Sequence, residues 1–248
     1  MKSRNRVLSV LSKILALVPA LLFFATLLLG SDPPWKHKPY KDWDAKDIER
    51  VFTDSPWTRT VTITRTWLPI TAKDLPNDQL AGRDRGLPGS ADRSSDTTVG
   101  GELELHIYWA SSRVMRAASA RKSVLHGGKD VDVEKYATEP QEEYQIVLQS
   151  TDMAPFARRD EKFFQANAFL QPKKSKQKIL PTRVQYERDA NGVLVTSAIF
   201  FFPKKTASGD PSIPADEKSV EFNCKLEQSG VLASFEPQKM IDGSGPTL

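Results

Sequence analysis

The sequence predicts an α+β fold: a largely antiparallel sheet of about seven strands with two or three short helices, preceded by an N-terminal hydrophobic helix. Three observations support this prediction. Apolar and polar residues alternate with a period of two in several short runs, as in half-buried strands. These runs follow one another through turns and do not alternate regularly with helices, which favours antiparallel pairing over a parallel wound sheet. Other short segments carry apolar residues at helical spacing.

The start of the chain is typical of an export signal or an N-terminal membrane anchor. Basic residues come first, an apolar run follows over 14–29, and a polar segment begins after Gly30. The run is slightly shorter than the roughly 17–25 residues that a membrane helix needs, so cleavage and retention both stay open. If uncleaved, residues 7–30 enter the membrane. Because basic residues stay on the cytoplasmic side, we expect the remainder outside it, in the periplasm or cell envelope, either secreted or anchored.

The charge balance of the exported part argues against nucleic-acid binding. The chain holds 35 Lys and Arg and 31 Asp and Glu, a net charge of +4. Four basic residues of the leader account for that excess, because the leader contains no acid: Lys2, Arg4, Arg6 and Lys13. The rest is neutral overall, and its aromatic residues lie mostly at the spacing of a strand core. A single cysteine, Cys224, lies on an apolar strand face and is expected to be a core residue.

The chain divides into a leader, a tether and one domain. After residues 1–30, the proline-containing segment 31–43 is predicted to be an extended tether. A single α+β domain is expected over 44–248. Within it, the polar, glycine-containing stretch 68–100 is predicted to be a flexible insertion, because it offers almost nothing to a core.

The first elements of the domain have clear local signals. Asp44 is an N-cap residue with a carboxylate three positions later, so a short helix is predicted to start there and to end before Pro56. Threonines alternate with apolar residues over 58–67, which indicates a strand. A second strand is expected over 102–109, and Ser111 or Ser112 then caps a helix that extends to a break at His126.

The second half of the domain is predicted to be richer in strands. After a strand over 143–149 and a helix over 160–170, the segments 181–188 and 193–202 are predicted to form a hairpin. Asn191 and Gly192 can take the positive φ values of its turn. The returning strand is apolar on both faces, so we expect it inside the sheet. Strands over 220–227 and 231–235 complete the set.

Lysines give the best candidate for a binding surface. Two groups are predicted to lie near the ends of the aromatic hairpin: Lys173, Lys174, Lys176, Lys178, Lys204 and Lys205. Together they can bind anionic lipid, anionic glycan or an acidic envelope protein. The alternative interpretation is solubility, because lysines beside apolar strands also protect against aggregation.

Two further sets of residues are weaker candidates. Glu102, Glu104 and His106 alternate on the outward face of their strand, where they can bind a divalent cation or pair an acid with a base, or simply be solvated. Trp43 and Trp57 bracket the first helix and can form either a ligand platform or, by default, part of the core. Catalytic motifs are absent from the sequence, and no cofactor is expected.

Several segments resemble a family of exported bacterial proteins for which no activity is known. The tryptophan of 39–43 and the Asp-Ser-Pro-Trp element that ends 47–57 carry the resemblance, together with three later segments: 173–178, 202–209 and 216–222. It implies an exported domain and transfers no catalytic residue. We therefore expect a non-enzymatic binding or structural domain. The alternatives are a small hydrolase or metal-dependent enzyme built on Glu102, Glu104 and His106, and an envelope scaffold or assembly subunit.

Overall fold

The computed structural model describes residues 32–65, 101–129, 131–226 and 229–248. The predicted leader and the predicted insertion at 68–100 therefore lie outside the described residues. The helices are α2 (Pro34–His37), η2 (Tyr40–Asp42), α3 (Ala45–Thr53), α5 (Arg113–Leu125), α6 (Val133–Thr138), α7 (Ala154–Ala157), α8 (Glu161–Asn167) and η5 (Pro237–Lys239). The strands are β1 (Thr58–Thr64), β2 (Glu102–Trp109), β3 (Glu143–Gln149), β4 (Ala168–Pro172), β5 (Arg183–Arg188), β6 (Val195–Pro203), β7 (Val220–Lys225), β8 (Gly230–Phe235), β9 (Ile241–Asp242) and β10 (Gly245–Pro246).

The described strands pair only in antiparallel fashion, which confirms the α+β class. They form a five-stranded sheet in the order β1-β2-β3-β6-β5, a three-stranded sheet in the order β4-β7-β8, and the ribbon of β9 and β10. All seven predicted strands are present, but they do not make a single sheet. Alternation of apolar residues reveals which face of a strand is buried, and it does not reveal which sheet covers that face.

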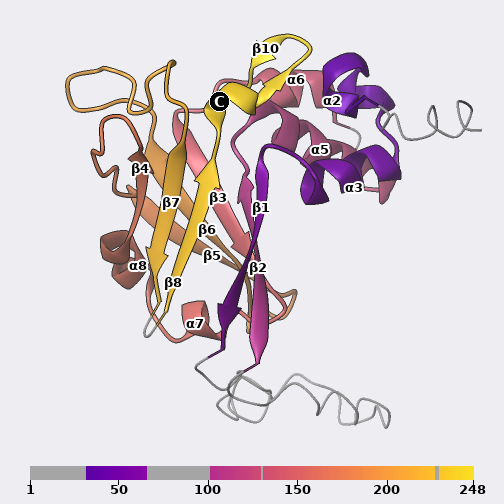
Figure 1. The fold of residues 1–248 in the computed structure, drawn as a ribbon. Helices are drawn as coiled ribbons and strands as arrows, with labels where there is room; N and C mark the ends of the chain where they lie inside the picture. The colour runs from indigo at the N-terminus through magenta and orange to yellow at the C-terminus, as the bar shows by residue number, and fades with distance from the viewer. Residues whose placement is uncertain (1–31, 66–100, 130, 227–228) are drawn as a thin grey trace, which may run out of the picture.

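The two larger sheets pack face to face around an aromatic core (Figure 1). Phe200 of β6 meets Phe222 of β7 with ring centroids 5.3 Å apart, and Trp109 of β2 meets Phe235 of β8 at 5.2 Å. The edges β1 and β8 lie close together, while α8 packs against β5 and β7 on the other side and buries Phe164. As predicted, β6 lies inside its sheet, between β3 and β5.

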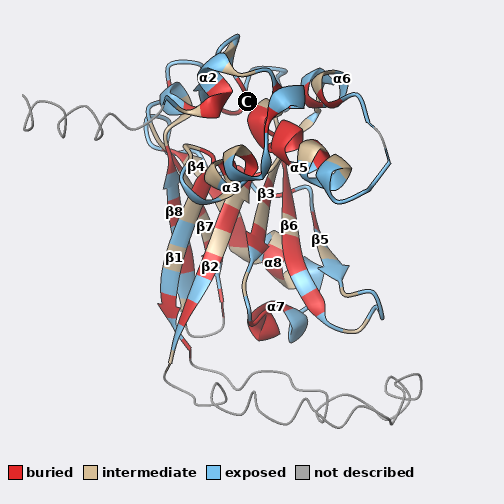
Figure 2. Cartoon of the chain, turned by 90° about the vertical axis from the view of Figure 1, so that its right-hand side faces the viewer, coloured by how far each residue is buried: buried red, intermediate tan, exposed pale blue. Residues whose placement is uncertain are grey.

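The helices α3 and α5 pack against each other at one end of the five-stranded sheet, over its outer face (Figure 2). The predicted capping of α3 is confirmed, because Asp44 and Asp47 exchange side-chain to backbone hydrogen bonds of 2.9 and 3.1 Å. Helix α5 starts at the predicted cap Ser112, whose Oγ accepts a hydrogen bond from the Met115 amide. No helix among the described residues combines the length and apolar character needed to cross a bilayer.

The prediction of an extended tether is wrong for the described part of 31–43. This segment forms α2 and η2, and it buries Trp35, Tyr40 and Trp43. The Tyr40 hydroxyl donates a hydrogen bond to the Asp242 carboxylate, and the Gly243 amide donates to the Trp35 carbonyl over 3.0 Å. Burial of large aromatic rings stabilises this folded arrangement. The prolines do not prevent it, because they lie at the starts of short helices, where a residue without an N–H is tolerated.

Two local predictions also need correction. The helix predicted over 160–170 ends at Asn167, and the next residues form β4, which the sequence pattern did not separate from the helix. The turn of the β5–β6 hairpin does not use positive φ at Asn191. Within the turn only Gly192 has positive φ (+70°), and the Gly192 amide donates to the Asp189 carbonyl over 2.8 Å, so residues 189–192 form a four-residue turn whose last residue is a left-handed glycine.

Candidate functional site

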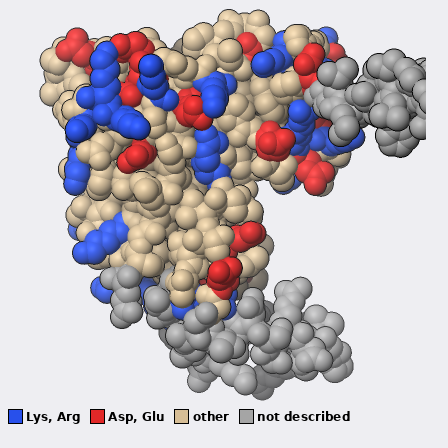
Figure 3. Space-filling model, viewed as in Figure 1, with Lys and Arg blue, Asp and Glu red and all other residues tan. Residues whose placement is uncertain are grey.

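The predicted lysines lie at one end of the two packed sheets, in two loops. One loop, 173–178, follows β4, and the other, 204–219, joins β6 to β7. Figure 3 shows Lys and Arg side chains over the upper ends of β4 and β7, with Asp and Glu side chains among them. We call the six predicted residues the lysine surface: Lys173, Lys174, Lys176, Lys178, Lys204 and Lys205.

Three of these six lysines already have partners within the chain. The Lys174 ammonium donates to the Asp216 carboxylate, and this hydrogen bond raises the pKa of the Lys174 amine. Lys178 lies with Nζ 4.1 Å from the centroid of the Phe169 ring. Lys204 is half-buried against the Tyr144 ring at 5.2 Å, and burial lowers its pKa. These cations are partly satisfied before any ligand arrives.

A buried carboxylate holds the backbone of this surface in place. The Glu217 residue is 1% exposed, and its carboxylate accepts backbone hydrogen bonds from Lys174 (3.2 Å), Lys218 (3.0 Å) and Ser219 (3.3 Å). The Lys173 amide also donates to the Ser219 carbonyl over 2.9 Å. The 173–178 loop is therefore tied to the segment before β7, and in the sequence Glu217 stands out only as part of the segment 216–222 of the family resemblance.

The two tryptophans do not form a ligand platform, so that prediction is wrong and the core-packing interpretation is confirmed. Trp43 and Trp57 are both 0% exposed. Their indole nitrogens donate to the Lys38 carbonyl over 3.2 Å and to the Thr247 hydroxyl over 2.8 Å. Rings with satisfied N–H groups are stable in a core, and no face of either ring is left for a ligand.

The three residues proposed for an enzyme or metal site lie on the outer face of β2, as predicted, but they do not converge. Glu102 and Glu104 are exposed, and the half-buried His106 has Nδ1 3.2 Å from the Thr60 hydroxyl. Alternate residues of a strand are roughly 6.6 Å apart, which spreads their side chains along the face. The described residues contain no group of three or more His, Cys, Asp or Glu side chains that could hold a metal ion.

A groove that the sequence did not reveal lies where α3 and α5 overhang the sheet. Its volume is about 660 Å³. In Figure 3 the surface turns inward below α3, at the corner between the helices and the sheet. We call this site the overhang groove, and its lining residues are Ala45, Ile48, Glu49, Phe52, Tyr108, Ser119, Lys122, Ser123, Leu125, His126 and Gln149.

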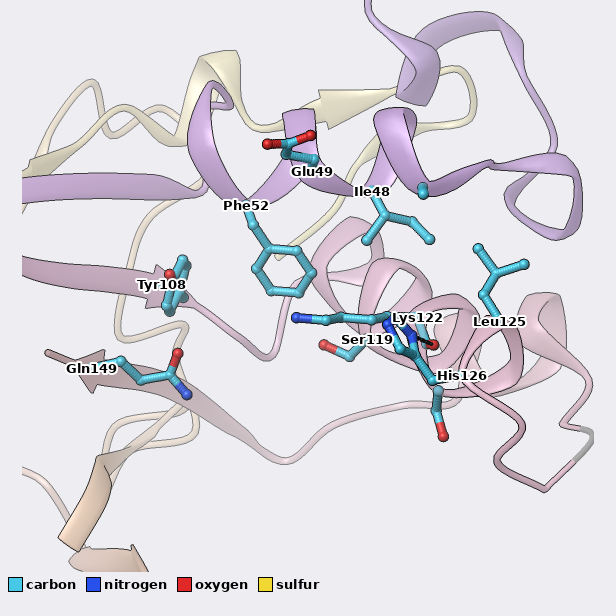
Figure 4. Close-up of a pocket in the computed structure, with 11 residues that line it drawn as sticks. Ile48, Glu49, Phe52, Tyr108, Ser119, Lys122, Leu125, His126 and Gln149 are labelled. Carbon is cyan, nitrogen blue, oxygen red and sulfur yellow. Dashed lines mark hydrogen bonds between the residues drawn. The ribbon is translucent and has the colours of Figure 1, made fainter. Parts of the chain in front are cut away.

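The walls of the overhang groove are largely apolar. Phe52 of α3 and Tyr108 of β2 are half-buried, and their rings meet edge to face with centroids 5.6 Å apart. Burial raises the pKa of the Tyr108 hydroxyl. Leu125 remains 44% exposed at the opposite side, although leucine is normally a buried residue. Figure 4 shows these side chains around the groove, with the Phe52 ring between Tyr108 and Leu125.

Among the described residues, Lys122 is the one Lys or Arg side chain that lines the groove. The Lys122 ammonium lies 5.3 Å from the centroid of the Phe52 ring, a distance typical of a cation–π contact. Within the described part of the chain, no acidic side chain forms an ion pair with Lys122. In Figure 4 the acidic residue of the lining, Glu49, lies on the other side of the Phe52 ring from Lys122. The positive charge is thus available to a ligand.

The end of α5 positions a histidine beside that cation. The Gly127 amide donates to the Val124 carbonyl and the Gly128 amide to the Ser123 carbonyl, which is the Schellman pattern of helix termination. Gly127 has φ of +77°, and a Cβ on Gly128 would lie 2.3 Å from the Ser123 hydroxyl. The expected break at this point is confirmed, and both glycines are needed to turn the chain there.

The same turn assigns the tautomer of His126. Its Nδ1 lies 2.7 Å from the Lys122 carbonyl oxygen. A carbonyl only accepts hydrogen bonds, so Nδ1 must carry a proton and donate it. The second ring nitrogen, Nε2, then remains to accept or, in the charged ring, to donate. The site therefore combines aromatic walls, one ammonium, one imidazole and the Gln149 amide at the sheet.

Comparisons with known proteins supply no family for this chain. No family model matches it, and neither a curated protein nor a solved structure matches it. The resemblance to exported bacterial proteins therefore stays a prediction. Functional conclusions must come from the chain's own residues.

Proposed function

We propose that this chain is a non-enzymatic binding domain on the outer side of the cytoplasmic membrane, secreted or anchored by its N-terminal segment, and that the overhang groove holds its ligand. The leader pattern of residues 1–30 supports the location. The groove supports the binding role, because a hollow with apolar walls and a few polar groups is the commonest form of a ligand site.

The observation that carries this proposal is the accessible apolar surface of the groove, together with a cation that has no acidic partner among the described residues. Ligand pockets usually measure about 300–1,000 Å³, and the groove's volume of about 660 Å³ lies in that range. Phe52, Tyr108 and Leu125 keep apolar surface accessible that a ligand can cover. Lys122 adds a charge without an ion-pair partner among the described residues. Covering the apolar surface lowers the free energy of the complex. An anion that pairs with Lys122 compensates for the loss of water around its charge.

A retention experiment tests the role of the groove. The full chain is expressed in a bacterial host, purified from the envelope fraction, and its bound small molecules are extracted and identified by mass spectrometry. We expect a molecule that the Ser119→Trp variant no longer retains, because an indole at this exposed lining position fills the groove. Ala166→Trp, at an exposed position of α8, is the matched control and should retain the same molecule. Retention of equal amounts by all three proteins would contradict the proposal.

The location has its own test. A periplasm-active reporter enzyme at the C-terminus should be active when it is fused to the full chain. Activity only of a cytosol-specific reporter would contradict the proposed side of the membrane.

A second candidate function is binding of an anionic lipid, glycan or envelope protein by the lysine surface. The organised backbone around Glu217 favours it, since a held loop loses less conformational entropy when a ligand binds. Lys173, Lys176 and Lys205 form no ion pair within the described residues. The ion pair of Lys174 with Asp216, and the acidic side chains that lie among these lysines in Figure 3, make this candidate the weaker of the two.

A further inference from the structure

We propose that the ligand of the overhang groove is a small organic carboxylate with an apolar body, such as an aryl-alkanoate or a medium-chain fatty acid. This inference rests on the proposed function and specifies the ligand's chemistry. Two properties of the groove support it, namely the apolar walls and the position of the single ammonium.

The apolar body of the ligand follows from the walls. Ile48 and Phe52 lie one helical turn apart on the underside of α3, and Tyr108 faces them from the sheet. The Phe52 and Tyr108 rings leave their remaining edges and faces toward the space, and the exposed Leu125 closes the far side. A fully polar ligand would strip water from its own groups and gain few hydrogen bonds from such walls.

The negative charge of the ligand follows from Lys122. The lysine stem packs along the groove while its ammonium lies over the Phe52 ring, so the charge is held in place and has no acid beside it. A carboxylate meeting it would form a charge-assisted hydrogen bond. The free Nε2 of His126 lies on the same helix end as a second polar group, and the hydrogen bond at Nδ1 orients its ring.

A single charge fits better than a phosphate or a cation. Phosphate sites gather several donors, usually backbone amides, whereas the described lining of this groove contains one Lys or Arg side chain, Lys122. A cationic ligand would meet Lys122 directly, and Glu49 lies away from it across the Phe52 ring. A monovalent anion is therefore the charge that the site complements.

Calorimetry with three matched probes tests the inference. The full chain in phosphatidylcholine nanodiscs is titrated with 4-phenylbutyrate, 4-phenylbutan-1-ol and 4-phenylbutylamine, which differ only in the terminal group. We expect the carboxylate to bind more tightly than the alcohol, and the amine to bind least. Lys122→Met keeps the apolar stem and should weaken carboxylate binding by about tenfold, as expected for one hydrogen bond to a charged group. It should leave the alcohol's affinity unchanged.

Two controls make each outcome decisive. Lys46→Met removes the same charge from an exposed position of α3 that does not line the groove, and it should leave all three affinities unchanged. Ser119→Trp should abolish binding of every probe. Equal affinity for acid and alcohol, both lost in Ser119→Trp, would overturn the carboxylate and keep the groove as the ligand site. Absence of saturable binding, or binding that Ser119→Trp leaves intact, would overturn the carboxylate. The retention experiment then decides separately whether the groove binds anything.

Discussion

The lysine surface and the overhang groove differ in how far their side chains are already satisfied. In the lysine surface, Lys174 pairs with Asp216, two other ammonium groups lie against aromatic rings, and Glu217 holds the backbone. In the groove, the apolar walls are half-exposed, and Lys122, which also lies over an aromatic ring, has no acidic partner among the described residues. A cluster of charges is easy to recognise in a sequence. A ligand, however, gains binding free energy mainly from surface that the chain itself leaves uncovered. The groove is the better candidate for that reason.

The two regions also depend on different buried carboxylates, so each can be disrupted alone. Helix α5, which lines the groove, and the N-terminal segment are both tied to the C-terminal ribbon through Asp242. The carboxylate of Asp242 accepts hydrogen bonds from the Arg113 guanidinium at 2.7 and 2.8 Å, from the Tyr40 hydroxyl, and from the Ser244 amide and hydroxyl at 2.8 Å. The lysine surface depends on Glu217.

The largest effect is expected for Asp242→Ala. The Asp242 side chain is 3% exposed, and its removal leaves the partly buried Arg113 without its acid. Removing one partner of a buried ion pair costs about 3 kcal/mol, which urea denaturation of the full chain should reveal as a lower midpoint. The exposed Asp210 provides the control, and Asp210→Ala should leave the midpoint almost unchanged. An unaltered midpoint in Asp242→Ala would show that the β9–β10 ribbon does not hold α5 and the N-terminal segment in place.

The same carboxylate gives a pH dependence. Burial alone would raise the pKa of Asp242, but hydrogen bonds from Arg113, Tyr40 and Ser244 outweigh it and hold the pKa below its ordinary value. The stabilisation is therefore complete above the pKa of about 3.9 that the unfolded chain has, and it is lost as pH falls through the lower pKa of the folded state. Denaturation midpoints measured from pH 6 to pH 2 should fall less steeply in Asp242→Asn than in the unmodified chain. Parallel curves would contradict this assignment.

A smaller effect is expected for Glu217→Ala, and it should be confined to the lysine surface. Three backbone amides lose their common acceptor, which costs about 2 kcal/mol after partial rehydration. Amide hydrogen exchange should accelerate around Lys174 and Ser219 and stay unchanged in α3 and α5. The neighbouring Asp216 is exposed, and Asp216→Asn should not change the urea midpoint. Faster exchange in α5 would mean that the two regions are not independent.

Gly127→Ala is expected to have a still smaller effect, at the end of the groove. A side chain at φ of +77° costs about 1 kcal/mol, because this region is strained for residues with a Cβ. The strain should also displace His126 and weaken 4-phenylbutyrate binding. Gly230→Ala is the matched control, because its added Cβ would meet only the Cys224 carbonyl at an ordinary 3.7 Å. A groove unaffected by Gly127→Ala would mean that His126 does not contribute to binding.

The features that could be predicted from the sequence are those with local causes. Asp44 and Asp47 cap α3 within one helical turn, and the glycines after His126 end α5 within three residues. Strand alternation likewise located β2 and β3 to the residue. The start of β4 was missed because Phe164 and Ala168 are four residues apart, a spacing that fits a continuing helix, while the two-residue alternation begins only at Ala168.

The groove could not be predicted because its parts come from distant segments. Phe52, Tyr108 and Gln149 meet only after β1, β2 and β3 have paired. One signal was present in the sequence: Tyr108 is a large aromatic ring on the polar face of β2, which it shares with Glu104 and His106. An aromatic residue on a solvent face indicates that something covers that face. Here the cover is α3, which contributes the Phe52 ring.

The smallest change in stability is expected for the double variant Lys173→Gln and Lys176→Gln, and this variant distinguishes the two candidate functions. Both side chains are exposed, so the free energy of unfolding should change by less than about 0.5 kcal/mol. If the lysine surface binds anionic glycans, the variant should elute from a heparin column at lower salt than a control with Lys46→Gln and Lys162→Gln, which loses the same charge elsewhere. Binding of 4-phenylbutyrate should be the same in both. Equal elution of the two variants would mean that heparin binding depends only on net charge. The lysine surface would then not be a specific site, and the overhang groove would remain as the candidate.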